Sequence, residues 1–420
     1  MEKKLVIEVH VGKRYGISRL NCDEAGQVKD VVIDNERYNR ISSQSKKRVW
    51  REHMEECIER MEHVYRTRAI KDILIKKFSA IENPFFQENA FEIADYIVKN
   101  IVASADAMDD ARNITKQIMI FTDYDIQDIV DCFCRLIPDK EAWEKLKKET
   151  EKEAAEEKKS KSKKKDEAEK KDNTKNKIIN SIKAILPMRP YGIECSLFGR
   201  MTTSKVMENV DSAVCVNHSY SFGKATMDSD YFITVDNYLS AKENETENGQ
   251  SGAGYLDSKD FATHVYYEYA SIDVGQFYRN LCKGVDMEKE SNRLRAKEVM
   301  IETLKCLIAD VVCAAPTGGQ NSFASFPDPV GVYITVRDSG TNRTADTCCI
   351  KELQISDYKK TEDEKFLSAM ENFTNNDFSA LTDYVEKFYI GEGAERMSGT
   401  EHKTLKETIE LLGEIVDERF

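Results

Sequence analysis

The segment 40–51 holds the residue types and spacing that best support a chemical role. It reads Arg-Ile-Ser-Ser-Gln-Ser-Lys-Lys-Arg-Val-Trp-Arg and contains five cationic side chains in twelve residues. Serines at the start of a helix offer N–H groups and hydroxyls to an anion. Ser43, Lys47 and Arg51 are spaced four residues apart, so a helix places them on one face. The pattern favours phosphate binding, and the alternative that it leaves open is a capped helix with a solvated face.

Hydrolytic and metal chemistry have weaker support in the sequence. No H-E-x-x-H spacing occurs among the histidines, and the cysteine pairs at 132/134 and 348/349 lack a second pair at zinc-finger spacing. The Gly-rich stretch 315–320 has no following Lys-Ser/Thr, so it is a tight turn or a backbone contact, not a P-loop. We therefore predict no catalytic residue, no metal site and no cofactor.

Composition limits the classes of protein to which the chain can belong. Its 420 residues are 40% hydrophobic and 33% charged, and no apolar run approaches the roughly 20 residues that a membrane helix needs. Glu8 and His10 interrupt the apolar N-terminus, which favours a strand over a signal peptide. Eleven scattered cysteines indicate no disulfide framework. These features predict a soluble cytoplasmic protein of two or three domains.

Charge is distributed unevenly along the chain. The formal net charge is −13, which argues against general nucleic-acid binding and requires any phosphate site to be a local basic patch. Residues 145–177 hold 14 Lys and 9 acidic residues. Within them, 149–177 has almost no apolar side chains, so we expect a disordered or loosely helical insertion. It is either a solvated tether or a basic arm for nucleic acid.

The hydrophobic pattern predicts an α+β fold. Strands are expected at 5–11, 192–200, 264–272 and 330–337, and helices at 43–61 and 288–314, with a mostly helical insertion after the first helix. Without its insertions, this order is βαββαβ. Two split βαβ units of this kind form the ferredoxin-like or RRM-like antiparallel sheet. The sequence lacks the RNP aromatic signature, so an RNA grip would differ from that of an ordinary RRM.

Several blocks of the sequence resemble the type I-E CRISPR Cascade backbone subunit, the CasC family. They begin with 40–48 and the preceding 20–24 and 28–30. Similar blocks follow in the same order at 192–203, 210–219, 230–237, 265–273 and 316–324. The resemblance covers about residues 5–337, while the region 62–147, the charged insertion and the C-terminus carry little signature.

The resemblance implies a right-hand-shaped subunit with an RRM-like palm, inserted helical fingers and a thumb hairpin or loop. The expected parts are palm 1–61, fingers 62–190 with the insertion 149–177, a palm strand 191–201, thumb 202–263, palm 264–340 and a mostly helical C-terminal extension 341–420. The family is non-catalytic, and several copies polymerise along one CRISPR RNA in an antiviral surveillance complex. The implied partners are CRISPR RNA, target DNA paired with the guide, other copies of the chain, other Cascade subunits and a separate nuclease-helicase; no membrane is involved.

The resemblance also assigns site residues. Lys29, Ser42, Gln44 and Lys47 match RNA backbone contacts, Met201 matches a palm residue beside a displaced base, and Tyr231 with Phe232 matches an aromatic pair of the thumb. To these we add Ser43, Arg51 and Arg200 from helix position and charge alone. Cys22 stands where the family commonly has Arg, so that contact is not transferred.

Two other functions remain open at this point. A backbone subunit of the type III effectors would cleave target RNA with an acidic loop residue, here Asp23 or Asp30. A helical interaction protein would bind no nucleic acid at all. Cleavage of bound RNA, or the absence of co-purifying RNA, would favour one of these alternatives.

Overall fold

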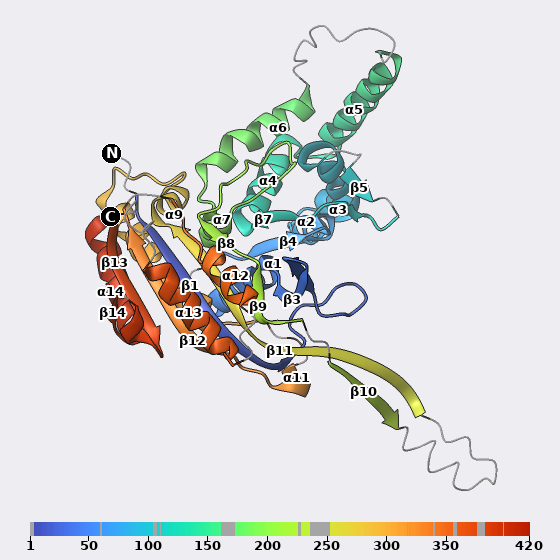
Figure 1. Ribbon diagram of the computed structural model, residues 1–420. Coiled ribbons are helices and arrows are strands. Elements are labelled where there is room, and N and C mark those ends of the chain that lie inside the picture. The colour runs from blue at the N-terminus through green and yellow to red at the C-terminus, as the bar shows by residue number, and fades with distance from the viewer. Residues whose placement is uncertain are drawn as a thin grey trace, which may run out of the picture. The chain divides into compact units, whose positions relative to one another are not determined.

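The computed structural model describes residues 4–58, 61–103, 107–109, 111–160, 173–225, 228–235, 253–316, 318, 320–338, 341–355, 359–375, 383–397 and 399–420 (Figure 1). The chain folds as two compact units. The first comprises Met1–Ile58, Val214–Gly275 and Ile301–Phe420, and the second comprises Glu59–Ala213 and Gln276–Met300. The chain passes between the units within α9 (Val274–Leu281) and α10 (Glu290–Cys313).

The first unit is built on one large sheet. The order along its main path is β14-β13-β12-β1-β11-β9-β3-β2, and β8 and β10 pair with β11 beside this path. Every pair is antiparallel except β13 with β14. The strands are β1 (Val6–Ser18), β2 (Asp30–Ile33), β3 (Glu36–Ile41), β8 (Val214–Val216), β9 (Ser219–Lys224), β10 (Asp228–Val235), β11 (Ala253–Asp273), β12 (Asp328–Arg337), β13 (Tyr384–Gly391) and β14 (Glu401–His402).

The centre of this sheet has the predicted βαββαβ connectivity, except that β9 takes the place of the expected strand at 192–200. The expected strands 264–272 and 330–337 lie within β11 and β12, the expected strand 5–11 matches the start of β1 to within one residue, and the expected helices correspond to α1 (Ser43–Cys57) and α10. Neighbouring strands run in the order β12–β1–β11–β9. This is the order that two split βαβ units produce when β9 is counted as the second strand.

The expected palm strand at 191–201 is wrong, because these residues form α7 (Gly192–Phe198) in the second unit. Short apolar runs do not distinguish a buried strand from a buried helix by periodicity. Here Gly192 and Gly199 flank the run with φ of 75° and 74°, a left-handed backbone that favours glycine and ends regular structure. The strands β8 and β9 therefore supply the pairing that the prediction gave to 192–200.

Helices cover both faces of the large sheet. Ile7 on one face of β1 lies against Leu304 of α10 and Leu412 of α14 (Leu405–Arg419). On the other face, a Cβ added to Gly12 would lie 2.6 Å from the ring of Phe366 in α13 (Glu362–Thr374), so only glycine fits at this position. Side chains of α12 (Asp346–Gln354) and α13 join the same hydrophobic core. The first unit is thus a three-layer structure.

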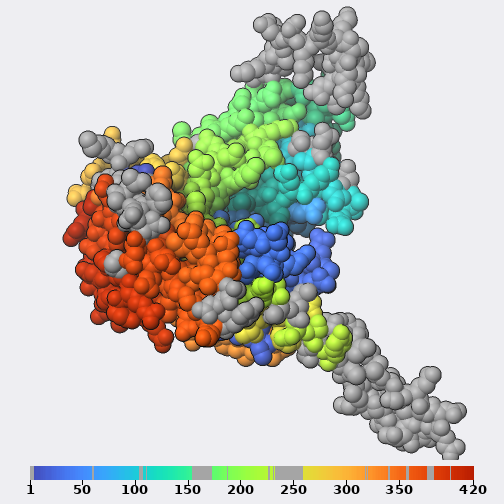
Figure 2. Space-filling model, viewed as in Figure 1, coloured from blue at the N-terminus to red at the C-terminus, as the bar shows by residue number. Residues whose placement is uncertain are grey.

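The C-terminal region is an integral part of the first unit. It was expected to be a mostly helical extension, but it also supplies β13 and β14 to the sheet. In the space-filling view its orange-to-red residues form a broad surface that continues into the blue N-terminal residues (Figure 2). The short helical segments of this unit are α11 (Gln320–Phe323) and η5 (Ala394–Arg396).

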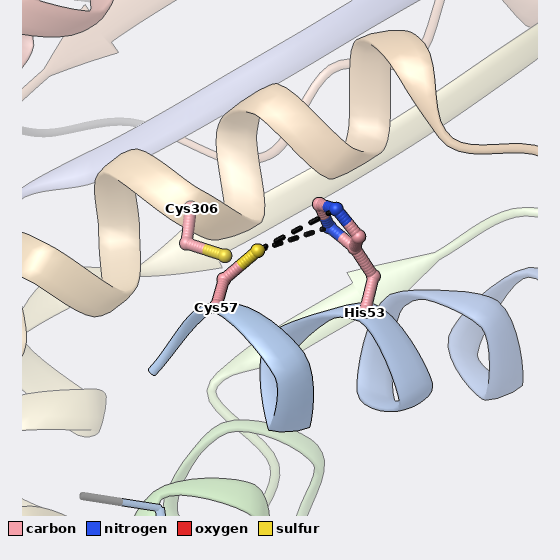
Figure 3. A group of neighbouring side chains, drawn as sticks. All are labelled: His53, Cys57 and Cys306. Atoms are coloured by element: carbon pink, nitrogen blue, oxygen red, sulfur yellow. Dashed lines mark hydrogen bonds between the residues drawn. The ribbon is translucent and has the colours of Figure 1, made fainter. Parts of the chain in front are cut away.

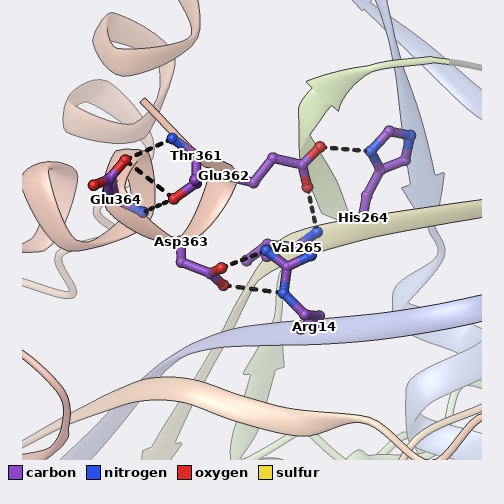
Figure 4. Close-up of polar contacts among 7 residues, drawn as sticks. All are labelled: Arg14, His264, Val265, Thr361, Glu362, Asp363 and Glu364. Atoms are coloured by element: carbon purple, nitrogen blue, oxygen red, sulfur yellow. Dashed lines mark hydrogen bonds and ion pairs between the residues drawn. The ribbon is translucent and has the colours of Figure 1, made fainter. Parts of the chain in front are cut away.

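The first turn of α13 binds directly to the sheet (Figure 4). Thr361 caps the helix in a capping box with Glu364. Glu362 accepts a hydrogen bond from the Val265 N–H at 2.6 Å and contacts His264 Nδ1 at 2.8 Å, while Asp363 pairs with Arg14 of β1. These carboxylates lie at the positive end of the helix dipole, where negative charge is stabilising. The helix is therefore fixed across β1 and β11.

The second unit is mainly helical, and most of its helices pack around a large hydrophobic core. Its helices are α2 (Ile70–Ser79), α3 (Pro84–Tyr96), η1 (Ile97–Val102), α4 (Asp123–Leu136), α5 (Lys140–Ser160), α6 (Thr174–Ile185), η3 (Leu186–Met188) and α7. Two small sheets pair β4 (Val64–Thr67) with β7 (Met119–Thr122) and β5 (Met108–Asp109) with β6 (Ile114–Thr115). The described parts include no helix long and apolar enough to cross a membrane.

Both described ends of the charged insertion are helical. Residues 149–160 continue α5, and α6 begins at Thr174; residues 161–172 lie outside the described residues. Glu149 Oε2 accepts a hydrogen bond from the Thr174 N–H at 3.2 Å, and Glu153 pairs with Lys175 at 3.4 Å. The described ends of the segment therefore contact each other.

Candidate nucleic-acid interface

The start of α1 is a well-formed helix cap. Ser42 has an extended backbone, and its hydroxyl accepts a hydrogen bond from the Ser45 N–H at 3.3 Å. The Ser42 N–H donates to Asn21 Oδ1 at 3.0 Å, which joins the preceding loop to the helix. Ser42 is buried. It therefore shapes the helix start, and the more accessible groups of this turn are those of Ser43 and Gln44.

The predicted cationic face of α1 is accessible in the structure. Ser43, Lys47 and Arg51 are all half-buried, and Gln44 is exposed beside them. The opposite face is buried through Lys46, Trp50 and Met54. A helix with this division presents hydroxyl, amide and guanidinium or ammonium groups in succession along about two turns. The geometry suits an extended anionic backbone.

Lys29 joins this face through the loop before β2. Its carbonyl accepts the Arg40 N–H at 2.8 Å, and its N–H donates to Asn21, the residue that also contacts Ser42. Arg40 Nη1 lies 2.8 Å from His218 Nδ1. Burial lowers the pKa of His218, and the nearby charges of Arg40, Lys46 and Lys29 lower it further. Three cations therefore lie close enough to act on His218: Lys29 from the loop before β2, Arg40 from β3 and Lys46 from α1.

Arg40 and His218 were not among the predicted site residues. Arg40 lies in the basic segment that the sequence analysis singled out, so its charge was a usable signal. His218 comes from the loop between β8 and β9, and its approach to Arg40 depends on the pairing of β3 with β9. No local pattern in the sequence could have indicated it.

Lys46 plays a different part from its neighbour Lys47. Its side chain is buried, with Nζ 2.6 Å from Ser219 Oγ and 3.0 Å from Asn217 Oδ1. Burial lowers its pKa to about 8, with the charge of Glu268 acting in the opposite direction. Lys46 therefore fixes α1 to the β8–β9 loop and to the start of β9, and it does not face solvent.

Tyr231 lies on a long β-hairpin formed by β10 and the first part of β11. The pairing runs from Asp228–Phe261 to Val235–Ala253. This hairpin, called the arm below, extends from the main sheet in Figure 1. Tyr231 is 74% exposed, so its ring is available for stacking. The side chain of Phe232 lies outside the described residues.

Arg200 and Met201 belong to the second unit and differ in accessibility. The Arg200 side chain is buried, with Nη1 2.9 Å from Asp125 Oδ2 and Nε 3.2 Å from the Glu208 carbonyl oxygen. Asp125 is also the capping-box residue of α4. The guanidinium of Arg200 is therefore part of the internal structure of this unit, which gives no support to its predicted role. Met201 is 87% exposed.

The two candidate catalytic aspartates have local structural roles. Asp23 Oδ1 accepts hydrogen bonds from the N–H groups of Ala25 and Gln27, each at 2.9 Å, and so closes its own turn. The Asp30 carboxylate pairs with Arg37 on the neighbouring strand. Each of the two carboxylates thus has a partner within a few residues of the chain.

Comparison with known families and structures gives the class of this protein. The Cas family model described as "CT1975-like protein" matches residues 7–418, so the chain belongs to that family. No curated protein matches the sequence.

Two solved structures share the fold over almost the entire chain. One, titled "CRISPR RNA-guided surveillance complex, pre-nicking", matches with a TM-score of 0.67 and 18% identity, covering 99% of this chain and 100% of the other. A second, titled "CRISPR RNA-guided surveillance complex", matches with a TM-score of 0.61 and 15% identity, covering 97% and 99%. The mixed α+β fold with a large, mostly antiparallel sheet is therefore that of chains in such complexes.

Proposed function

We propose that this protein is a non-catalytic backbone subunit of a type I-E CRISPR RNA-guided surveillance complex. Several copies bind along one CRISPR RNA and present it for pairing with target DNA in antiviral defence. In this proposal the sheet of the first unit is the RRM-like palm, the second unit forms the fingers, and the arm is the thumb.

One observation carries the proposal: the fold matches chains from two CRISPR surveillance complexes from end to end. Membership of the CT1975-like family supports the same conclusion. A match that covered only the sheet would have little weight, because ferredoxin-like sheets occur in many unrelated functions. Here the helical unit and the arm are included in the shared length.

The proposed RNA contacts are assigned by chemistry. Lys29, Lys47 and Arg51 would bind phosphates, Ser43 and Gln44 would donate hydrogen bonds to the RNA backbone, and Ser42 would hold the helix start in place. Met201, Tyr231 and Phe232 would pack against bases. Phosphate contacts carry no sequence information, so the subunit would accept any guide. Arg200 is left out because its guanidinium is engaged with Asp125.

Expression with a CRISPR array tests the proposal. The full chain should co-purify with CRISPR RNA in several copies per RNA, measured by the ratio of absorbance at 260 and 280 nm and by mass photometry. Adding a complementary RNA and Mg²⁺ should leave that RNA intact. Protein that elutes without RNA would reject the proposal, and regular cleavage of the RNA would favour the type III alternative with Asp23 or Asp30.

A further inference from the structure

Four side chains with metal-binding donors meet where α1 ends beside α10. His53 and Cys57 are one turn apart on α1, and Cys306 and Asp310 are one turn apart on α10. The ligand atoms of His53, Cys57 and Cys306 all lie within 4.8 Å of one another. Figure 3 shows the two sulfurs facing each other across the helix pair with the imidazole beside them. All four residues belong to the first unit.

The spacing of these atoms suits tetrahedral coordination. Bonds of about 2.3 Å to sulfur and 2.0–2.1 Å to nitrogen place neighbouring ligand atoms about 3.3–3.8 Å apart in a tetrahedral site. The His53 Nε2 to Cys57 Sγ distance is 3.5 Å. The other two pairs of ligand atoms lie no more than 4.8 Å apart.

Asp310 orients the imidazole. Its side chain is only 2% exposed, and its Oδ1 forms a hydrogen bond with His53 Nδ1. A proton on Nδ1 leaves the Nε2 lone pair as the ligand. Metal-bound histidines commonly donate their second N–H to a carboxylate in this way. The second oxygen of Asp310 lies 3.8 Å from Cys306 Sγ, so the carboxylate contacts two members of the set.

We propose that His53, Cys57 and Cys306 bind one zinc-class divalent cation that links α1 to α10. Two thiolates and an imidazole are the donor set that Zn²⁺ prefers. Both thiols release their protons to solvent as the metal binds. His53 and Cys57 are exposed, so water can complete the coordination as the fourth ligand. The ion holds the C-terminal end of α1 in place, while the cationic face lies nearer its N-terminal end.

Metal titration of the reduced, metal-free full chain tests this proposal. One equivalent of Co²⁺ should produce the charge-transfer absorption of a thiolate site, and Zn²⁺ should displace it. Cys57→Ser and Cys306→Ser should each weaken Zn²⁺ binding at least tenfold. Asp310→Asn should weaken it roughly 10–100-fold while keeping the two-thiolate absorption. Cys313→Ser is the matched control, because Cys313 is an exposed cysteine on the same helix outside the cluster.

Three results would overturn the proposal. One is the absence of stoichiometric binding in a chain that is folded by circular dichroism. Another is an equal loss of binding in Cys313→Ser and Cys57→Ser, which would indicate scattered thiol binding. The third is a Cys57–Cys306 disulfide in the purified protein together with no metal uptake after its reduction. Because RNA binding is not a readout, failure here is distinguishable from failure of the proposed function.

Discussion

Lys47 and Arg51 occupy successive turns of the accessible face of α1, and their proposed partners are phosphates. Lys47→Ala with Arg51→Ala should weaken RNA binding equally for all guide sequences, because neither residue reads a base. Two lost phosphate contacts should flatten the slope of log affinity against log salt by about 1.4 units for a single strand.

The matched control for this double variant is Arg48→Ala. Arg48 lies on the same helix but is exposed on another face, where it pairs with Glu52 at 2.7 Å. Filter binding at several salt concentrations should show a slope close to that of the wild type for the control. A double variant with an unchanged slope and an intact circular dichroism spectrum would remove Lys47 and Arg51 from the interface.

His10 makes stability depend on pH. Burial, with a smaller contribution from Arg343, lowers its pKa to about 3 from the ordinary value of 6.5. Its Nδ1 lies 2.9 Å from the Tyr267 hydroxyl, which accepts the Ala345 N–H. Below pH 6.5, His10 therefore binds a proton in the unfolded chain but stays neutral in the folded chain until the pH approaches 3. This stabilisation is complete above pH 6.5 and is lost as pH falls towards 3.

The variant His10→Gln isolates this effect. Between pH 7 and pH 5 the wild type should lose about 2 kcal/mol of its free energy of unfolding relative to the variant. Urea unfolding at the two pH values measures the difference. A difference between the two proteins that stays constant with pH would show that His10 binds its proton as readily in the folded chain as in the unfolded chain.

Some site residues could be predicted from the sequence and others could not. The face of Ser43, Lys47 and Arg51 follows from helical spacing alone, and the structure leaves it accessible. The charge of Arg200 could be read from the sequence, but its burial against Asp125 could not, because Asp125 lies 75 positions away. The spacing of His53 and Cys57 is visible locally, but Cys306 and Asp310 reach them only after the sheet has brought α10 beside α1.

The helices α5 and α6 include the two ends of the charged insertion 149–177, so deleting the insertion tests whether these ends contribute to stability. Composition predicted that 149–177 contributes no core, but its described ends are helical and make contacts. Thr150 Oγ1 lies 2.8 Å from the Tyr96 hydroxyl, and the Tyr96 ring packs on Trp143. Deleting 149–177 should therefore lower the melting temperature, by roughly 2–4 °C for each kcal/mol lost.

A shorter deletion serves as the comparison. This variant replaces only residues 161–172 with a Gly/Ser linker and keeps Glu149, Thr150 and Glu153. The removed residues are almost all charged. It should leave the melting temperature nearly unchanged. Equal melting temperatures for both deletions would mean that the contacts of 149–153 contribute nothing measurable, and calorimetry distinguishes the two cases.

Helices and strands could be predicted from the sequence where the spacing of apolar residues and the length of the segment indicated the same type of element. The long helix α10 and the strands β1, β11 and β12 lie close to the predicted positions, because sustained apolar spacing identifies each type. β1 continues to Ser18 beyond the predicted end. Its Lys13 is buried and donates hydrogen bonds to the carbonyl oxygens of Val311 in α10 and of Ala314 just after that helix. A polar residue compensated by a distant element has no local signature.

For the whole molecule, the arm should decide between a multi-copy scaffold and a monomeric binder. β9 and β11 are antiparallel neighbours, so a short turn can join residue 225 to residue 261 without disturbing the sheet. The variant that joins these two residues lacks residues 226–260. It should remain folded and bind short RNA, but it should no longer assemble in several copies on a long guide. Tyr231→Ala alone should weaken RNA binding by roughly 1–3 kcal/mol if its ring stacks on a base.

Mass photometry with short and long RNA separates the outcomes. Assembly that survives the deletion would place the contacts between copies elsewhere. Loss of binding to short RNA in a chain that remains folded would instead assign the primary RNA contact to the arm. An unfolded deletion variant would show that the arm supports the sheet, and Tyr231→Ala then carries the test.

The strand β11 belongs to the sheet and to the arm at once. It runs unbroken for 21 residues, pairing with β1 from Asp273 to Ala262 and with β10 from Phe261 to Ala253. At about 3.3 Å per residue, the part paired with β10 reaches roughly 30 Å. The length of the arm therefore depends on the number of residues in each of its strands. Adding two residues to each of its strands lengthens it by about 7 Å with every side chain on its original face, while adding one reverses the faces.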